Sequence, residues 1–173
     1  KKIKSWAEKG NTIISIGSAS KFLIDKKIVS EQLIEKKESE TTDKLPYVDA
    51  RENRGKEQIG GVILRSIIDL THPLSFGYEN NTLPVYKNNS VWLKPSKNQY
   101  SSVVQYQDDA LIDGFMSENN KSKLNESVSL IVSKVGSGIA IMFADNPNFR
   151  GAWYGTNRLF LNAIFLGDRI YIP

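Results

Sequence analysis

The sequence predicts an α/β fold with an open, mostly parallel sheet flanked by helices, to which antiparallel strands and a hairpin are added. Three features near the start of the chain indicate this class. Residues 1–9 place apolar side chains at helical spacing and are followed by Gly10. Thr12–Ile16 is a short apolar run suited to a buried parallel strand. Residues 17–20 then turn the chain into a second helical stretch, which completes the helix–strand–turn–helix order of α/β sheets.

The length of 173 residues predicts one domain over residues 1–173. Because the chain opens inside the α/β pattern, we expect the first strands of such a sheet to be missing from this segment. A helix is expected over residues 28–37, where Ile28, Val29, Leu33 and Ile34 form an apolar side. Residues 35–58 are rich in charge and are expected to form a long surface loop.

After Gly60 and Gly61 the pattern becomes typical of strands, with a helix near the end. Gly136-Ser137-Gly138 separates two apolar runs and predicts a hairpin turn. Apolar residues at helical spacing predict a closing helix over residues 156–165, with Thr156 as its N-cap. Strands are expected at residues 62–70, 83–86, 90–94, 102–107, 128–134, 139–144 and 170–172.

The composition excludes several kinds of chemistry. The chain has no cysteine and one histidine, which excludes a disulfide scaffold, a cysteine nucleophile, a thiolate metal site and a cluster of histidine ligands. No metal and no cofactor are therefore expected within this segment. No apolar run approaches the ~20 residues of a membrane span. The net charge is +4, but residues 25–57 mix both signs. The excess positive charge sits at the start, on Lys1, Lys2, Lys4 and Lys9, and is then scattered singly, so no nucleic-acid partner is expected.

The turn at Gly17 and Ser18 is the first candidate site, because α/β enzymes place nucleophiles and anion sites where a strand turns into a helix. The glycine spacing of a nucleophile elbow around Ser18 is missing, and a serine would need His72, the only imidazole, as its base. The simpler interpretation is that Ser18 or Ser20 caps the following helix, and that His72 hydrogen-bonds to backbone or to Asp69.

The second candidate site is the segment 146–158, which joins a buried strand to the last helix. Open sheets form their ligand crevice at such positions. Asn146, Arg150, Trp153 and Arg158 offer an amide, an aromatic ring and two guanidinium groups for a small anionic or peptide ligand. The alternative is a structural loop that is pinned by its arginines and packs its aromatic rings on the sheet.

Several segments resemble one known family. Residues 13–19 (IISIGSA) resemble the nucleophile strand and elbow of class I glutamine amidotransferase-like domains, with Gly17 where an active enzyme has its cysteine. Residues 69–78 (DLTHPLSFGY), 148–151 (NFRG) and 155–163 resemble more specifically the amidotransferase-like domain at the C-terminal end of bacterial zinc carboxypeptidases of the carboxypeptidase A type. The resemblance is closest over residues 60–167 and weak over 35–57.

This resemblance implies a non-catalytic accessory domain with a flavodoxin-like fold. The parent enzyme would be exported from a bacterium, to the periplasm or beyond, and would hydrolyse peptides with zinc held in a domain outside this segment. The parent's peptidase domain is then the expected partner. Two alternatives of other classes stay open: a serine hydrolase using Ser18 with His72, and a carbohydrate-binding module using Trp92, Trp153 and Tyr154.

Overall fold

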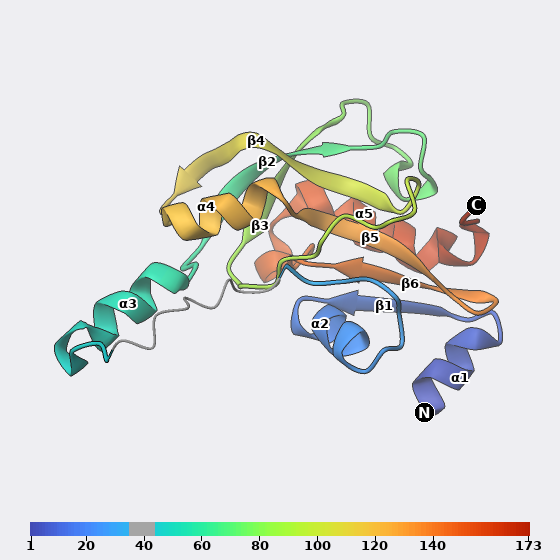
Figure 1. Ribbon diagram of the computed structural model, residues 1–173. Coiled ribbons are helices and arrows are strands. Elements are labelled where there is room, and N and C mark those ends of the chain that lie inside the picture. The colour runs from blue at the N-terminus through green and yellow to red at the C-terminus, as the bar shows by residue number, and fades with distance from the viewer. Residues whose placement is uncertain (35–43) are drawn as a thin grey trace.

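A computed structural model describes residues 1–34 and 44–173 and has an α/β architecture (Figure 1). One curled sheet of six strands has helices on both faces. The strand order across the sheet is β1-β6-β5-β4-β2-β3. The strands are β1 (Thr12–Ile16), β2 (Val62–Ile68), β3 (Thr82–Lys87), β4 (Ser102–Gly114), β5 (Val128–Val135) and β6 (Gly138–Phe143).

The expected mostly parallel sheet is wrong, because the sheet is mostly antiparallel. Only β1 and β6 pair in parallel, with Ile14 beside Ile141. The other four neighbouring pairs are antiparallel. For the pair of β5 and β6 the cause is local, because only the two residues Gly136-Ser137 connect these strands. Antiparallel strands can be joined by so short a turn, whereas a parallel pair needs a crossover of a dozen or more residues.

The helices are α1 (Lys2–Glu8), α2 (Ser18–Asp25), α3 (Ala50–Glu57), α4 (Glu118–Asn125) and α5 (Tyr154–Leu166). They cover the sheet on both faces, except for α3, which contacts α4 and lies away from the sheet (Figure 1). Ala7 and Leu23, from α1 and α2, pack in one core cluster with Ala140 and Met142. Leu159 and Ala163, from α5, pack in the other cluster with Ile141 and Phe143. Alternate residues of β6 therefore point to opposite faces, each covered by helix, which explains why its sequence is apolar throughout.

Several expected elements differ in the structure. Residues 28–34 form no helix: Ile28 and Val29 are buried in irregular backbone, and Leu33 makes a single bridge to Leu93. Lys27, at φ 51°, breaks the helical path after α2. The expected helix residues 35–37 lie outside the described residues, as does part of the expected 35–58 loop.

Other expected elements also differ in the structure. Residues 50–57 of the expected loop form α3, which buries no side chain. Within 90–94 only Leu93 makes isolated bridges, and 170–172 is not a strand. The last helix begins at Tyr154, so Thr156 is not its N-cap: its Oγ1 donates to the Pro147 carbonyl at 2.8 Å. None of the helices in the described ranges has the length and hydropathy needed to span a bilayer.

Candidate functional site

The turn at Gly17 has the shape of a strand-to-helix elbow. Gly17 follows β1 directly and stands at φ 56° and ψ −119°, and α2 begins at the next residue. Its N–H donates to the Phe143 carbonyl at 2.8 Å, which ties the elbow to the end of β6. Residues with a side chain rarely adopt this backbone conformation because it is strained. Unless a function offsets the strain, the conformation favours glycine.

The expected serine cap of α2 is wrong. The N-cap residue is Gly17, and no side chain caps the helix. Ser20 is instead fully buried, donates to the Phe143 carbonyl at 2.8 Å and contacts the Ser15 hydroxyl at 3.0 Å. Ser18 is exposed at the start of the helix. The two serines of the turn thus have different roles: Ser18 is open to solvent, whereas the hydrogen bonds of Ser20 connect the elbow to β1 and β6.

The sheet topology separates Ser18 from His72. Following the pairings across the sheet, β2 runs antiparallel to β1 and lies four strand spacings away. At ~4.8 Å per spacing these strands are roughly 19 Å apart. Ser18 follows the carboxyl end of β1, and His72 follows the carboxyl end of β2 at the opposite end of the sheet. A base must lie within hydrogen-bond reach of its nucleophile, so this geometry contradicts a Ser18–His72 pair.

His72 has a structural role at the end of β2. Its Nδ1 accepts a hydrogen bond from the Leu74 N–H at 3.1 Å and so caps the short 3-10 turn Pro73–Ser75. Burial lowers the pKa of His72 from its ordinary value of 6.5, against the opposing charge of Asp69. The hydrogen bond needs an unprotonated Nδ1, so geometry and burial both favour the neutral ring.

The four candidate residues of segment 146–158 do not converge on one ligand site. Asn146 accepts a hydrogen bond from the Asn148 N–H at 2.9 Å, closing a local turn. Trp153 donates from Nε1 to the Pro84 carbonyl at 3.1 Å. Arg158 donates to the Gly77 carbonyl and lies over the Tyr78 ring, in the connection between β2 and β3. Arg150 is exposed and lies over the ring of Phe149.

These contacts match the structural alternative for the segment. Phe149 stacks on Tyr86 of β3 at 3.9 Å between ring centroids, and Trp153 lies at 6.0 Å from the same ring. The aromatic surfaces are thus used within the chain. Trp92 is only 4% exposed, and a buried indole offers no face for stacking on a sugar. Of the three residues proposed for carbohydrate binding, only Tyr154 is freely exposed.

A buried ionic network lies at the end of the sheet where β1 and β6 finish. Lys87, the last residue of β3, is fully buried, and its Nζ lies 3.0 Å from Asp145 Oδ1, just beyond β6. The other carboxylate oxygen accepts hydrogen bonds from the hydroxyls of Tyr106 and, at 2.8 Å, Ser129. Nζ also donates to the Val91 carbonyl at 2.8 Å. The network therefore joins residues from β3, β4, β5 and the end of β6.

This network is sealed from reactants. Burial lowers the pKa of Lys87, with Asp145 opposing the shift, and burial followed by the Asp145 charge raises the pKa of Tyr106 well above 10. The cavity beside Asp145 and Ser129 has a volume of about 10 Å³, which is about the space of one water molecule. Such perturbed groups can mark catalytic sites, but here no substrate has room to reach them, so the network's role is to hold the strands together.

The pattern of residues along β3 contains a signal for the burial of Lys87 that does not take the form of a motif. Leu83, Val85 and Lys87 alternate along β3 and share its buried face. A lysine at the third core-facing position of a strand requires a buried partner. Asp145, directly after the apolar run of β6, is the carboxylate that meets this need.

No metal centre is evident in the residues that the structure describes, because nowhere in them do three or more histidine or carboxylate side chains gather as a ligand set. Comparison of the chain with protein families, curated proteins and solved structures gave no match.

Proposed function

We propose that this chain is a non-catalytic accessory domain, of the amidotransferase-like kind that accompanies the peptidase domain of bacterial zinc carboxypeptidases. The observation that carries the proposal is Gly17. It takes a sharp strand-to-helix turn, the position where α/β hydrolases expose a nucleophile, yet it has no side chain to supply one. The family assignment rests on the resemblance of residues 13–19, 69–78 and 148–163.

The remaining polar groups support a domain without its own chemistry. Ser18, the nearest hydroxyl to the elbow on the exposed side, has no imidazole within reach, because His72 lies at the opposite end of the sheet. The Lys87–Asp145 pair is shielded from solvent by the strands it joins. An accessory role leaves the outer surface of the domain as the place where a partner binds.

The proposal is tested first on the isolated chain. It is incubated, with added Zn²⁺, with a peptide that has a free C-terminal carboxylate, and separately with a fluorophosphonate that labels activated serines. We expect no release of the terminal amino acid and no label. Chelator-sensitive release, or a label that disappears in Ser18→Ala while persisting in the control Ser30→Ala, would overturn the non-catalytic assignment.

The second experiment tests the parent. The polypeptide that carries this sequence is immunopurified from the cells that express it, and its carboxypeptidase activity is measured with and without a chelator. A chelator-sensitive release of C-terminal residues supports the proposed parent. A purified polypeptide with no such activity contradicts the carboxypeptidase assignment, whatever the isolated chain does.

A further inference from the structure

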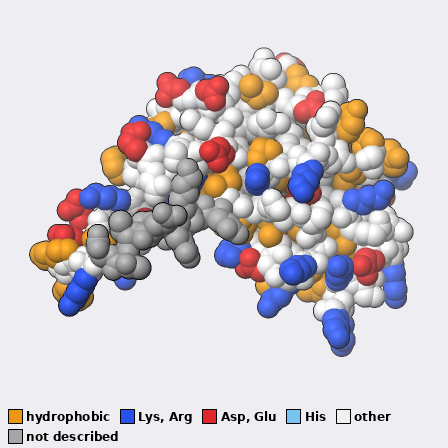
Figure 2. All heavy atoms as spheres, in the orientation of Figure 1, with side chains coloured by type: hydrophobic (Ala, Val, Ile, Leu, Met, Phe, Trp, Pro, Cys, Tyr) orange, Lys and Arg blue, Asp and Glu red, His pale blue; other side chains and the backbone are white. Residues whose placement is uncertain are grey.

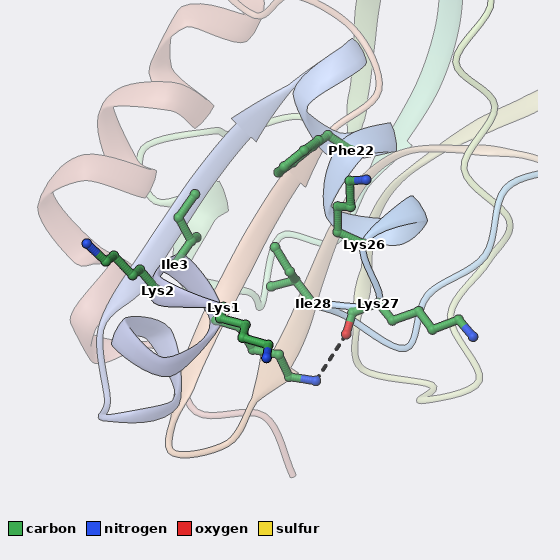
Figure 3. A pocket seen from close by; sticks show the side chains of 8 residues that line it. Lys1, Lys2, Ile3, Phe22, Lys26, Lys27 and Ile28 are labelled. Atoms are coloured by element: carbon green, nitrogen blue, oxygen red, sulfur yellow. Dashed lines mark hydrogen bonds between the residues drawn. The ribbon is translucent and has the colours of Figure 1, made fainter.

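A groove with an apolar floor lies between α1 and the end of α2. Its volume is about 680 Å³, which is within the usual range of ligand pockets. Ile3 of α1, Phe22 of α2 and Ile28 form the floor (Figure 3). Ile3 is 51% exposed and Phe22 is 44% exposed, so the fold leaves a substantial apolar surface uncovered here.

Positive charge surrounds this floor. The groove is lined by five lysines, Lys1, Lys2, Lys4, Lys26 and Lys27, and by no acidic residue. Their five positive charges exceed the net charge of +4 of the whole chain, so positive and negative charges nearly balance in the rest of the molecule. Figure 2 shows the blue side chains gathered over α1 and α2, at the lower right of the view.

One of these lysines is held in place by a hydrogen bond, and no carboxylate of the described residues pairs with any of the five. Lys4 Nζ donates to the Lys27 carbonyl at 3.0 Å, which fixes α1 against the turn that follows α2. Within the described ranges none of the five forms an ion pair. By contrast Lys21, which lies on α2 but does not line the groove, pairs with Asp25 at 2.7 Å. Figure 3 shows the side chains of Lys2 and Lys27 extending outward on opposite sides of the groove.

We propose that this groove binds an acidic peptide segment, with one aromatic or aliphatic side chain on the floor and carboxylates on both sides of it facing the lysines. The charge of the rim requires an anionic partner, and the floor requires an apolar group within it. A hollow floor fits a side chain better than a flat bilayer surface. Nucleic-acid strands stack successive bases on several aromatic rings, whereas this floor has one aromatic ring, Phe22, between two aliphatic residues, so it fits a single peptide side chain better.

This inference does not rest on the proposed parent, because it depends only on the shape and charge of the groove. The probe is a fluorescein-labelled peptide with one phenylalanine flanked on each side by two glutamates, and binding is measured by fluorescence anisotropy. We expect saturable binding that weakens as NaCl is raised. Replacing the glutamates by glutamines, or the phenylalanine by serine, should each reduce affinity about tenfold or more.

Protein variants locate the site. Lys2→Glu combined with Lys26→Glu, one residue from each side of the groove, should reduce affinity at least about tenfold. The control Arg51→Glu with Arg54→Glu makes the same change in net charge on α3, at the other side of the molecule (Figure 1), and should change affinity less than about twofold. Phe22→Ala tests the floor against Phe165→Ala, an exposed phenylalanine of α5. Circular dichroism confirms that each variant is folded.

Each result decides the proposal. Equal loss in the two charge-reversed pairs, equal binding of the glutamine peptide, or no binding of the glutamate peptide would overturn it. Binding to phosphatidylserine vesicles or to single-stranded DNA, without binding to the peptide, would replace the acidic peptide by a membrane or a nucleic acid. The hydrolysis and labelling assays on the isolated chain are separate measurements, so either proposal can fail alone.

Discussion

At the scale of single residues, the Lys87–Asp145 pair is the most demanding feature of the molecule. Both charges are withdrawn from water, which costs several kcal/mol per ion unless each is fully paired. Here the carboxylate has three partners and the ammonium also lies 4.4 Å from the centre of the Trp92 ring. Because both groups have hydrogen-bond partners, the fold can accommodate the buried pair. Loss of one member would leave the charge of the other unpaired in the core.

Lys87→Met should therefore lower the free energy of unfolding by about 3–5 kcal/mol. The matched control, Lys21→Met, breaks the exposed pair with Asp25 and should cost no more than about 0.5 kcal/mol. Urea denaturation followed by circular dichroism measures both. Asp145→Asn should cost less in the Lys87→Met background than in the native chain, and strictly additive losses would contradict the coupling.

His72 predicts a dependence of stability on pH. Its pKa is lower in the folded chain than the ordinary 6.5, so between these values the unfolded chain binds more protons. The free energy of unfolding should be largest above pH 6.5 and fall as the pH decreases from there toward the lowered pKa. Denaturation midpoints measured across this pH range give the slope of stability against pH. No other histidine contributes to it, because His72 is the only one in the chain.

The matched variant is His72→Asn, whose side-chain oxygen can accept the hydrogen bond from the Leu74 N–H in place of Nδ1. It should flatten the pH dependence while leaving the stability above pH 7 nearly unchanged. A slope that persists in His72→Asn would show that another group controls stability in this range.

At the scale of elements, the elbow between β1 and α2 depends on the backbone of one residue. Gly17→Ala should reduce stability by about 1–3 kcal/mol, because an alanine is strained at φ 56° and ψ −119°. The cost is conformational, since a Cβ there would meet nothing closer than the Ala144 carbonyl at 3.9 Å. Gly55→Ala, within α3 and with open space around it, should instead stabilise by about 0.5–1 kcal/mol. Two changes of the same sign in thermal unfolding would contradict this account.

The local pattern predicted the elements whose burial is simple. β1, β2, β5 and β6 were expected close to their observed places, because an apolar run between turn residues has few other folds open to it. Residues 28–34 were misread because Ile28 and Val29 fit a helix face but are buried in irregular backbone. The strand expected at residues 102–107 was too short, because β4 continues through Asp108 and Asp109. This solvated, bulged part pairs with β2 alone, and acidic residues are tolerated there.

To decide whether the candidate residues form a site, one needs the distances between them, and a pattern of residues in the sequence does not give these distances. Ser18 and His72 could be proposed as a nucleophile and its base because the sequence shows neither the order nor the direction of the strands that carry them. Arg158 was grouped with Arg150 by proximity in the chain, but α5 carries Arg158 to the connection after β2. Three of the five groove lysines stand at the start of the sequence, but Lys26 and Lys27 come from the turn after α2, and the apolar floor likewise combines residues from α1, α2 and that turn.

At the scale of the whole molecule, stability should be concentrated in the middle of the sheet. All six residues of β6 and all but one of β5 are buried, whereas α3 buries none. Opening of α3 exposes almost no apolar surface, so its cost should be close to zero compared with the cost of unfolding the sheet.

Hydrogen exchange followed by mass spectrometry tests this distribution. Amides of β5 and β6 should exchange only by global unfolding and so follow the denaturant dependence of the whole chain, while those of α3 exchange fastest among the described helices. The internal control is α4, which has the same length of eight residues as α3 but buries Asn120 and Leu124. Since α3 and α4 have the same length and differ in burial, equal protection of the two would mean that packing against the sheet does not govern local stability in this fold.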